Sequence, residues 1–155
     1  MNLTVPLTSA EDTAALAQRL GVQLHAGDTI LLTGDVGAGK THFARALIQS
    51  LLAQPEDVPS PTFTLVQTYD AADGTEIWHA DLYRLTGPSE IEELGLIDAL
   101  TNAICLIEWP DRLASLRPAN ALDITLCATD EDDHRLLTAQ WSDPRWTTRL
   151  TDWTL

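Results

Sequence analysis

The sequence predicts an α/β domain in which a sheet is flanked by helices and followed by a C-terminal β-hairpin. Three observations predict this class. Apolar runs of strand length alternate with segments whose apolar residues recur at helical spacing. The first buried strand, residues 28–34, enters a glycine-rich loop that leads directly into a helical segment. Near the end of the chain, an alternating pattern on both sides of an acidic turn is typical of a hairpin.

The first half of the chain contains the elements around the glycine-rich loop. A helix is expected to begin after Ser9, a capping residue, and to end at Gly21, with apolar residues at helical spacing between them. The buried strand at 28–34 follows, and after the loop a second amphipathic helix covers 41–53. Strand, loop and helix therefore succeed one another in the order that a phosphate-binding unit requires.

The second half of the chain continues the alternation. Two strands are expected within 60–85, joined by an Ala-Ala-Asp-Gly turn. A single helix is expected over 87–100 with Ser89 as its cap, then a buried strand over 103–110, and finally the hairpin over 121–141. With 155 residues, the chain is expected to form a single domain spanning 1–155.

Charge and composition exclude several classes of protein. Nine basic residues stand against 23 acidic ones, for a net charge of −14, so unaided binding of DNA or RNA is not expected. The first residues lack a signal-peptide pattern, and no apolar stretch is long enough to cross a membrane. We therefore expect a cytoplasmic protein with no membrane partner. Cys105 and Cys127 lie in strand-like runs and are interpreted as buried small hydrophobes.

Lys40, the only lysine in the chain, lies in the glycine-rich loop. Gly34, four residues, then Gly39, Lys40 and Thr41 form the pattern of the phosphate loop of P-loop NTPases, so the fold is expected to be P-loop NTPase-like. Backbone N–H groups of such a loop surround a phosphate chain at the positive end of a helix. The Lys40 ammonium would contact the β and γ phosphates, and the Thr41 hydroxyl is a natural Mg²⁺ ligand.

A phosphate loop usually works with an acidic residue at the end of a neighbouring strand. Glu108 follows four apolar residues, and Asp81 ends another apolar-leaning stretch. Each has a plain alternative as an ordinary strand-end carboxylate. Thr62, in the loop after the second helix, is a candidate for sensing the γ-phosphate, or it simply begins a strand after Pro61.

The nucleobase follows from an absence in the sequence. GTP-binding domains read guanine with an Asn-Lys-x-Asp motif, and a chain whose single lysine is Lys40 cannot contain one. Adenine is therefore the expected base, and ATP with Mg²⁺ the expected cofactors.

Two other clusters have ordinary interpretations. The acidic run at 129–134 is interpreted as a solvated hairpin tip rather than a metal cluster. The three tryptophans of the C-terminal segment are interpreted as packing, with an exposed patch for a partner as the alternative; they are Trp141, Trp146 and Trp153.

Four motifs in sequence order carry a family resemblance. These are GDVGAGKT, SPTFTLVQTY, HADLYRL and IEWPDRL, and together they resemble the bacterial TsaE (YjeE) family over nearly the whole chain. The resemblance implies a small ATPase required for N6-threonylcarbamoylation of adenosine 37 in tRNAs that read codons beginning with A. It further implies TsaD and TsaB as protein partners, ATP hydrolysis that resets their complex between turnovers, and contact with tRNA only through that complex.

The resemblance also implies roles for individual residues. Thr41 and Glu108 would hold Mg²⁺, Thr62 and Asp81 would lie beside the γ-phosphate, and Asp81 would orient the attacking water. Trp109, directly after Glu108, is either a site residue or simple packing. The residues implied to wrap the phosphates are Asp35, Val36, Gly37, Ala38, Gly39, Lys40 and Thr41.

The resemblance also implies residues beside the adenine, and the sequence differs from the family's usual pattern at one position of the site. The N-terminal segment around Glu11 to Thr13, with Asp12 and Thr13 as its candidate site residues, and Arg135 in the last hairpin would flank the adenine. The family commonly has a second threonine after the Mg²⁺ threonine, whereas this chain has His42. Its backbone N–H would still reach the α-phosphate, but a hydroxyl contact would be lost.

Two other function classes are the alternatives to a partner-dependent ATPase. A small-molecule kinase shares the phosphate loop but usually closes an arginine-rich lid, and Arg84, Arg112 and Arg117 are not clustered in the sequence. A nucleotide-sensing module would bind ATP without hydrolysing it.

Overall fold

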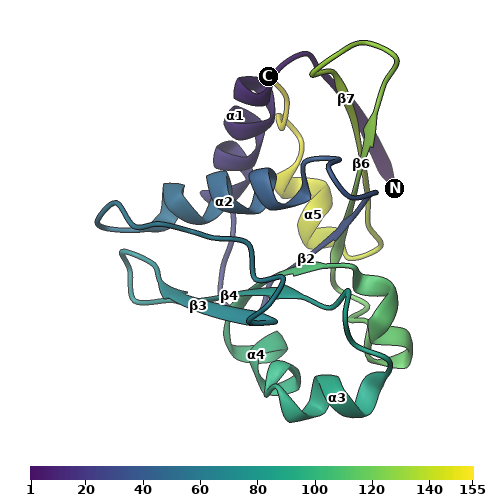
Figure 1. Ribbon diagram of the computed structural model, residues 1–155. Coiled ribbons are helices and arrows are strands. Elements are labelled where there is room, and N and C mark those ends of the chain that lie inside the picture. Colours follow the sequence, from purple (N-terminus) through teal and green to yellow (C-terminus); the bar gives the residue numbers. More distant parts are fainter.

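The computed structural model describes residues 1–155 and is built on one seven-stranded sheet (Figure 1). The strand order is β1-β7-β6-β2-β5-β4-β3. The neighbours β6, β2, β5 and β4 run parallel, and antiparallel pairs complete both edges. The strands are β1 (Asn2–Leu7), β2 (Thr29–Thr33), β3 (Val66–Asp70), β4 (Glu76–Asp81), β5 (Ile104–Glu108), β6 (Leu122–Ala128) and β7 (Arg135–Gln140). The parallel pairing brings the carboxyl ends of β2, β5 and β4 to one edge.

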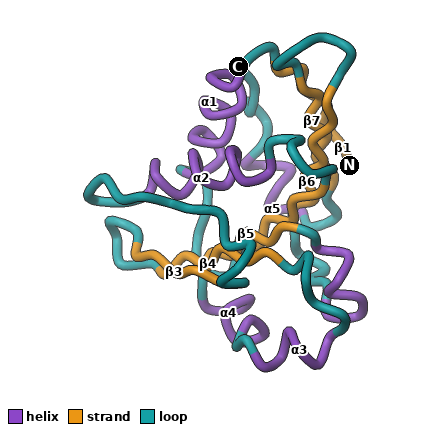
Figure 2. The backbone as a smooth tube through the Cα atoms, viewed as in Figure 1, coloured by secondary structure: helices purple, strands orange, loops and turns teal.

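Helices cover both faces of the sheet, as Figure 2 shows. One face carries α1, α2 and α5, and the other carries α3 and α4. The helices are α1 (Ala10–Gly21), α2 (Lys40–Leu51), α3 (Pro88–Glu93), α4 (Leu96–Asn102), α5 (Pro144–Arg149) and the 3₁₀ helix η1 (Pro110–Leu116). No helix combines the length and the apolar character that crossing a bilayer would require. The predicted α/β class with flanking helices and a C-terminal β6–β7 hairpin is confirmed.

The central strand β2 supplies side chains to both cores. Ile30 and Leu32 pack toward α1 and α2, while Leu31 between them packs toward α3 and α4. All three are fully buried, and each contributes roughly 1.5–3 kcal/mol relative to an exposed side chain. An uninterrupted apolar run is therefore what this doubly covered strand requires.

Several local predictions are confirmed. The Ser9 hydroxyl accepts a hydrogen bond from the Asp12 backbone N–H at 3.1 Å, which caps α1. The β3–β4 hairpin forms around the predicted turn. Its first strand begins later than the sequence predicts, at Val66, because residues 61–65 form a turn closed by the Leu65 N–H on the Pro61 carbonyl at 2.7 Å.

The prediction of one helix over 87–100 is wrong. The segment forms α3 and α4, separated at Gly95, whose φ of +80° breaks the helix. Ser89 is not the cap, because it lies inside α3 and the capping position is Gly87, which has no side chain. Apolar residues continue at helical spacing through the break, which is why the pattern suggested a single helix.

The C-terminal segment packs into the main core. Trp146 is fully buried and Trp153 is 5% exposed, so the packing interpretation is confirmed for these two and the exposed-patch alternative is wrong for them. The acidic hairpin tip is exposed, as predicted. Of the two cysteines, Cys105 is buried, and burial raises its pKa to about 12. Cys127 is exposed on β6, so the expectation of burial is wrong there.

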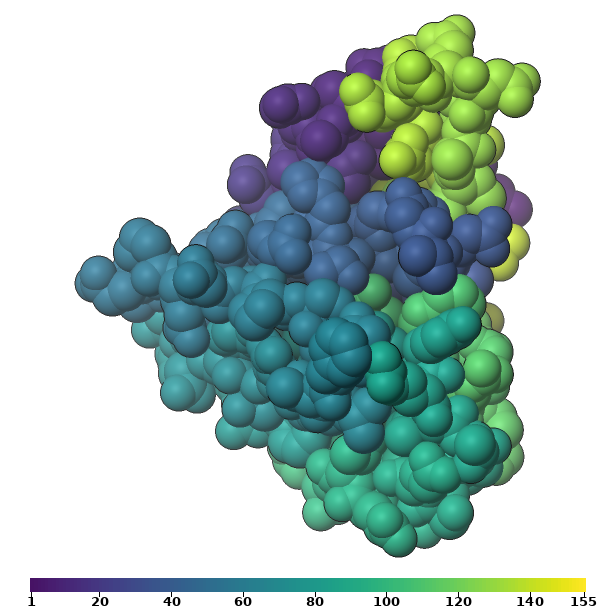
Figure 3. All heavy atoms as spheres, in the orientation of Figure 1, coloured from purple at the N-terminus to yellow at the C-terminus, as the bar shows by residue number.

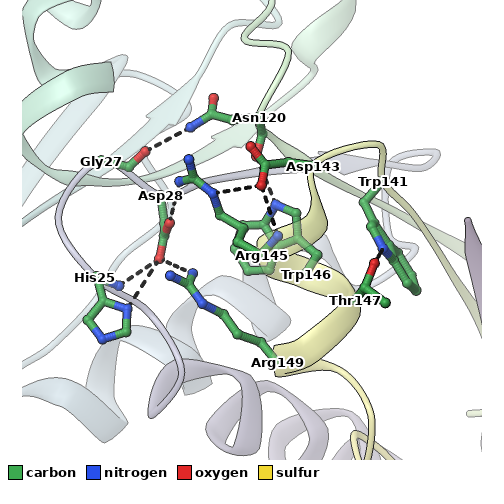
Figure 4. A network of polar contacts seen from close by, with 10 residues as sticks. All are labelled: His25, Gly27, Asp28, Asn120, Trp141, Asp143, Arg145, Trp146, Thr147 and Arg149. Atoms are coloured by element: carbon green, nitrogen blue, oxygen red, sulfur yellow. Dashed lines mark hydrogen bonds and ion pairs between the residues drawn. The ribbon is translucent and has the colours of Figure 1, made fainter.

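A polar network fixes α5 to the start of β2 (Figure 4). The Asp28 carboxylate, 1% exposed, accepts hydrogen bonds from Arg145 Nη1 at 2.9 Å and Arg149 Nη1 at 2.5 Å. It also accepts one from the His25 backbone N–H at 2.7 Å. The Trp146 indole donates to the Asn120 carbonyl at 2.8 Å. The network lies at the amino end of β2, opposite the phosphate loop.

Candidate active site

The loop between β2 and α2 has the backbone shape of a phosphate-binding loop. Gly37 and Gly39 have φ values of +82° and +107°, in the left-handed region that favours glycine. Gly39 occupies the N-cap position of α2, so the loop ends at the positive end of a twelve-residue helix. This arrangement is a ready-made site for an anion.

The Lys40 ammonium is enclosed at the base of the loop. It donates to the Gly34 carbonyl at 2.5 Å and the Asp35 carbonyl at 3.0 Å, and it lies 4.4 Å from the centroid of the Trp109 ring. Lys40 is 5% exposed. Burial lowers the pKa of Lys40 below its ordinary 10.5, although nearby carboxylates, led by Glu108, oppose that shift.

The lowered pKa of Lys40 predicts a pH dependence of stability. Between that lowered pKa and 10.5, the unfolded chain holds more protons than the folded protein, so the free energy of unfolding rises with pH. Relative to a Lys40→Met variant, the slope is expected to reach at most about 1.4 kcal/mol per pH unit. Urea denaturation of both proteins between pH 7 and 10 measures it. Parallel curves for the two proteins would contradict the prediction.

Two acidic residues meet at the carboxyl edge of the sheet. The parallel register places Asp81 directly opposite Glu108, and Glu108 opposite Leu32 at the end of β2. Both carboxylates are buried. The Thr41 hydroxyl donates to Glu108 Oε1 at 2.9 Å, so α2 and β5 meet at this pair.

Asp81 contacts the loop that precedes β3. Its Oδ2 lies 3.4 Å from the Thr62 hydroxyl, and its Oδ1 accepts the Tyr83 backbone N–H at 2.9 Å. One carboxylate oxygen is therefore fixed by backbone, and the other faces the loop threonine. This is the placement that a residue orienting a reactant needs.

The donor atoms around Glu108 fit a magnesium ion. Mg²⁺ is bound by oxygen ligands, usually one or two from protein side chains with the rest from phosphates and water. The Thr41 hydroxyl and the Glu108 carboxylate place two such ligands side by side at the loop. No nitrogen or sulfur ligand is needed to complete this set.

A pocket of about 340 Å³ joins these groups. In Figure 3 the blue phosphate loop and α2 lie between the yellow-green β6–β7 hairpin and the teal segment after α2. The lining residues are Val36, Gly37, Gly39, Lys40, Thr41, His42, Thr62, Asp81, Tyr83, Glu108 and Trp109. Asp35 and Ala38 belong to the loop but do not line the pocket.

The three residues expected beside the adenine lie outside the pocket lining. Asp12 and Thr13 are on α1, where Asp12 accepts hydrogen bonds from Thr8. These bonds lower the pKa of the Asp12 carboxyl. Arg135, at the start of β7, donates to the Ala38 carbonyl at 3.1 Å. The structure thus places a guanidinium against the outer side of the phosphate loop.

A model of the family described as threonylcarbamoyl adenosine biosynthesis protein TsaE matches residues 7–137. The chain belongs to the TsaE family. The resemblance inferred from the four motifs is thereby confirmed.

Similar proteins agree with this assignment. The tRNA threonylcarbamoyladenosine biosynthesis protein TsaE of Rickettsia conorii is 43% identical over 126 residues, covering 81% of this chain and 71% of that protein. The protein of the same name from Haemophilus influenzae is 39% identical over 122 residues, covering 77% and 76%. The crystal structure of YdiB from Bacillus subtilis superposes with a TM-score of 0.78 at 25% identity, covering 99% of this chain and 94% of that one.

His42 is where this TsaE-family chain departs from the expected second threonine. Its Nε2 lies 2.9 Å from the Ala10 carbonyl at the start of α1, while the residue also lines the pocket. His42 therefore joins the first turn of α2 to the first turn of α1. A threonine is too short for this contact.

The structure adds two site residues that sequence reasoning missed. Tyr83 lines the pocket and its ring centroid lies 4.8 Å from that of Trp109. His79 bonds Glu108 at 2.7 Å. Both residues belong to the HADLYRL motif, so the sequence motif could have drawn attention to them. Their contacts with Glu108 and Trp109 become visible only when β4 is paired with β5. Trp109 lines the pocket in a left-handed conformation, φ +58°, which costs on the order of 1 kcal/mol.

Proposed function

We propose that this TsaE-family protein is a Mg²⁺-dependent ATPase that supports N6-threonylcarbamoylation of adenosine 37 in tRNAs reading codons that begin with A. It acts with TsaD and TsaB, and ATP hydrolysis resets their complex between turnovers. The observation that carries the proposal is the convergence of Lys40, Thr41, Glu108 and Asp81 on one pocket at the end of β2.

The phosphate chain of ATP is bound by the loop. Backbone N–H groups at the start of α2 bind the phosphate oxygens, and the residues from Asp35 to Thr41 form the loop around them. The Lys40 ammonium turns from the Gly34 and Asp35 carbonyls to the β and γ phosphates. The backbone N–H of His42 reaches the α-phosphate. The family resemblance assigns the adenine to Asp12, Thr13 and Arg135, which lie outside the residues that line the pocket.

Hydrolysis needs an oriented water and stabilisation of negative charge. Asp81 Oδ2 accepts a hydrogen bond from the attacking water, with Thr62 beside it at the γ-phosphate. Thr41 and Glu108 would hold Mg²⁺, which would supply positive charge at the phosphates. Trp109 and Tyr83 cover the pocket beside Lys40 and limit access of other water.

The negative charge of the chain supports the proposal that the tRNA is bound by TsaD and TsaB rather than by this protein. At −14, the protein is repelled by the phosphates of tRNA, so tRNA reaches it only through TsaD and TsaB. Turnover by the isolated protein is expected to be slow, because the partners complete its site.

The arginines argue against the kinase alternative. Arg84 lies over the Phe63 ring at 4.5 Å, Arg112 pairs with Asp111, and Arg117 pairs with Asp123. None of the three lines the pocket, so no arginine lid stands over the phosphates.

Reconstituted tRNA threonylcarbamoylation over many turnovers tests the proposal. With TsaD, TsaB and ATP, we expect repeated turnover only when this protein is present, together with phosphate release above that of the isolated chain. An unchanged yield without it would contradict the proposal. ATP binding with no phosphate release would instead identify a sensing module, and a phosphorylated metabolite in a screen with labelled ATP would identify a kinase.

A further inference from the structure

His79, on β4, is the one fully buried histidine in contact with the candidate metal site. Its Nε2 lies 2.7 Å from Glu108 Oε2. The other ring nitrogen, Nδ1, is buried and has no hydrogen-bond partner. An unpaired buried polar atom is unfavourable, and an apolar side chain at this position would avoid it.

The hydrogen bond between His79 and Glu108 has a fixed direction. When Glu108 is ionised, as a ligand of Mg²⁺ must be, its oxygens only accept, so Nε2 carries the hydrogen and donates it to Oε2. This single bond is the polar contact that the imidazole makes within the protein. Because the only polar contact of the buried His79 ring is with Glu108, its role is to hold the Glu108 carboxylate in place.

The two oxygens of Glu108 have different surroundings. Oε2 is bonded to His79 at 2.7 Å and is 3.1 Å from the Thr41 hydroxyl, whereas Oε1 is bonded to Thr41 alone at 2.9 Å. His79 therefore occupies Oε2 and leaves Oε1 as the oxygen with free lone pairs beside Thr41. The orientation of the carboxylate follows from this division.

We propose that His79 is a positioning residue that fixes the Glu108 carboxylate so that Oε1 and the Thr41 hydroxyl together receive the divalent cation. This inference rests on the proposed function, because it concerns the same metal site. It assigns His79 no contact with nucleotide or water. Residues that orient a metal-binding side chain in this way change metal affinity by about 10–100-fold when they are replaced.

Two substitutions separate positioning from packing. His79→Leu keeps much of the buried volume and removes the donor, whereas His79→Gln places an amide N–H near the position of Nε2. Ile77→Val serves as the matched control, because Ile77 is fully buried on the same strand and contacts no site residue through a polar atom. His79→Asn, too short to reach Glu108, replaces the leucine variant if that variant does not fold.

The readout is Mn²⁺ binding followed by electron paramagnetic resonance, with a non-hydrolysable ATP analogue at saturation. We expect the Mn²⁺ Kd to rise about tenfold or more in His79→Leu, and to stay within about threefold of the parent in His79→Gln and Ile77→Val. Affinity for the analogue in EDTA is expected to be unchanged in all three.

Two results would overturn the inference while the proposed function stands. One is an unchanged Mn²⁺ Kd in His79→Leu, or in His79→Asn where it replaces the leucine variant. The other is an equal loss of Mn²⁺ affinity in His79→Gln and in the variant that lacks the donor. A parent protein that binds neither the analogue nor Mn²⁺ would overturn the proposed function, and this inference with it.

Discussion

An Asp81→Asn variant is expected to lose ATP hydrolysis while keeping its affinity for ATP. The kcat measured with TsaD and TsaB should fall by about 10²–10⁴-fold, the usual contribution of a group that accepts a proton or orients water. The amide is close in shape to the carboxylate, and its Oδ1 still accepts the Tyr83 backbone N–H. What is lost is the charged oxygen that faces Thr62. Single-turnover phosphate release measures the rate, and calorimetry with ATP measures the affinity.

Asp70→Asn is the matched control, because Asp70 ends the neighbouring strand β3 but is exposed and lies outside the pocket. It should leave kcat and Kd unchanged. Glu108→Gln is expected to act differently, by raising the Mg²⁺ concentration needed for half-maximal activity. If Asp81→Asn retained more than a third of the parent kcat, the role of orienting water would belong to another residue.

Replacing Asp28 by alanine is expected to give the largest loss of stability among single changes outside the apolar core. Asp28 is 1% exposed and bonded to two guanidinium groups. Removing one partner of a buried ion pair leaves the other charge uncompensated, which costs 3–5 kcal/mol in typical cases. Arg145 and Arg149 are partly exposed to water, so we expect about 3 kcal/mol. Urea denaturation at pH 7 measures the change.

Asp143→Ala is the matched control for Asp28→Ala. Asp143 also contacts Arg145, but it does so at the surface, where it caps α5 through the Arg145 backbone N–H. Its loss should cost about 1 kcal/mol, as for other N-caps. ATP affinity should be unchanged in both folded variants, since the network lies at the end of β2 opposite the loop. An Asp28→Ala protein as stable as Asp143→Ala would show that the buried pair contributes little.

Features encoded by neighbouring residues could be predicted from the sequence. Ser9 and Gly39 each occupy the N-cap of a helix and act on its first turn, and the sequence places both helices correctly. Features that depend on distant pairing could not. β1 contains Pro6, which weakens any strand pattern, and it exists because it pairs with β7, about 130 residues away. The helix α5 has six residues, too few to show a helical pattern in the sequence. Its place in the fold depends on the ion pairs of Arg145 and Arg149 with the distant Asp28.

The candidate site also combines residues that a local motif identifies with residues whose contacts depend on distant strand pairing. Lys40 and Thr41 follow from the local loop motif. Asp81 and Glu108 could be named as strand-end acids, but their proximity depends on the parallel register of β4 and β5, which no local pattern contains. His79 and Tyr83 stand in the same motif as Asp81, and only the pairing gives each its contact. Their roles are therefore a product of topology.

The three glycines of the loop are required for different reasons. A Cβ on Gly34 would lie 2.5 Å from the Leu126 carbonyl oxygen, whereas a Cβ on Gly37 or Gly39 would meet no atom within 4 Å. The first glycine thus serves the packing of the loop on β6, and the other two serve only its curvature. In evolutionary terms, a descendant freed from the proposed binding of ATP could replace the second and third glycines at the expense of backbone strain alone, because both have a positive φ but no neighbouring atom in the way. Selection for folding alone would still hold glycine at position 34.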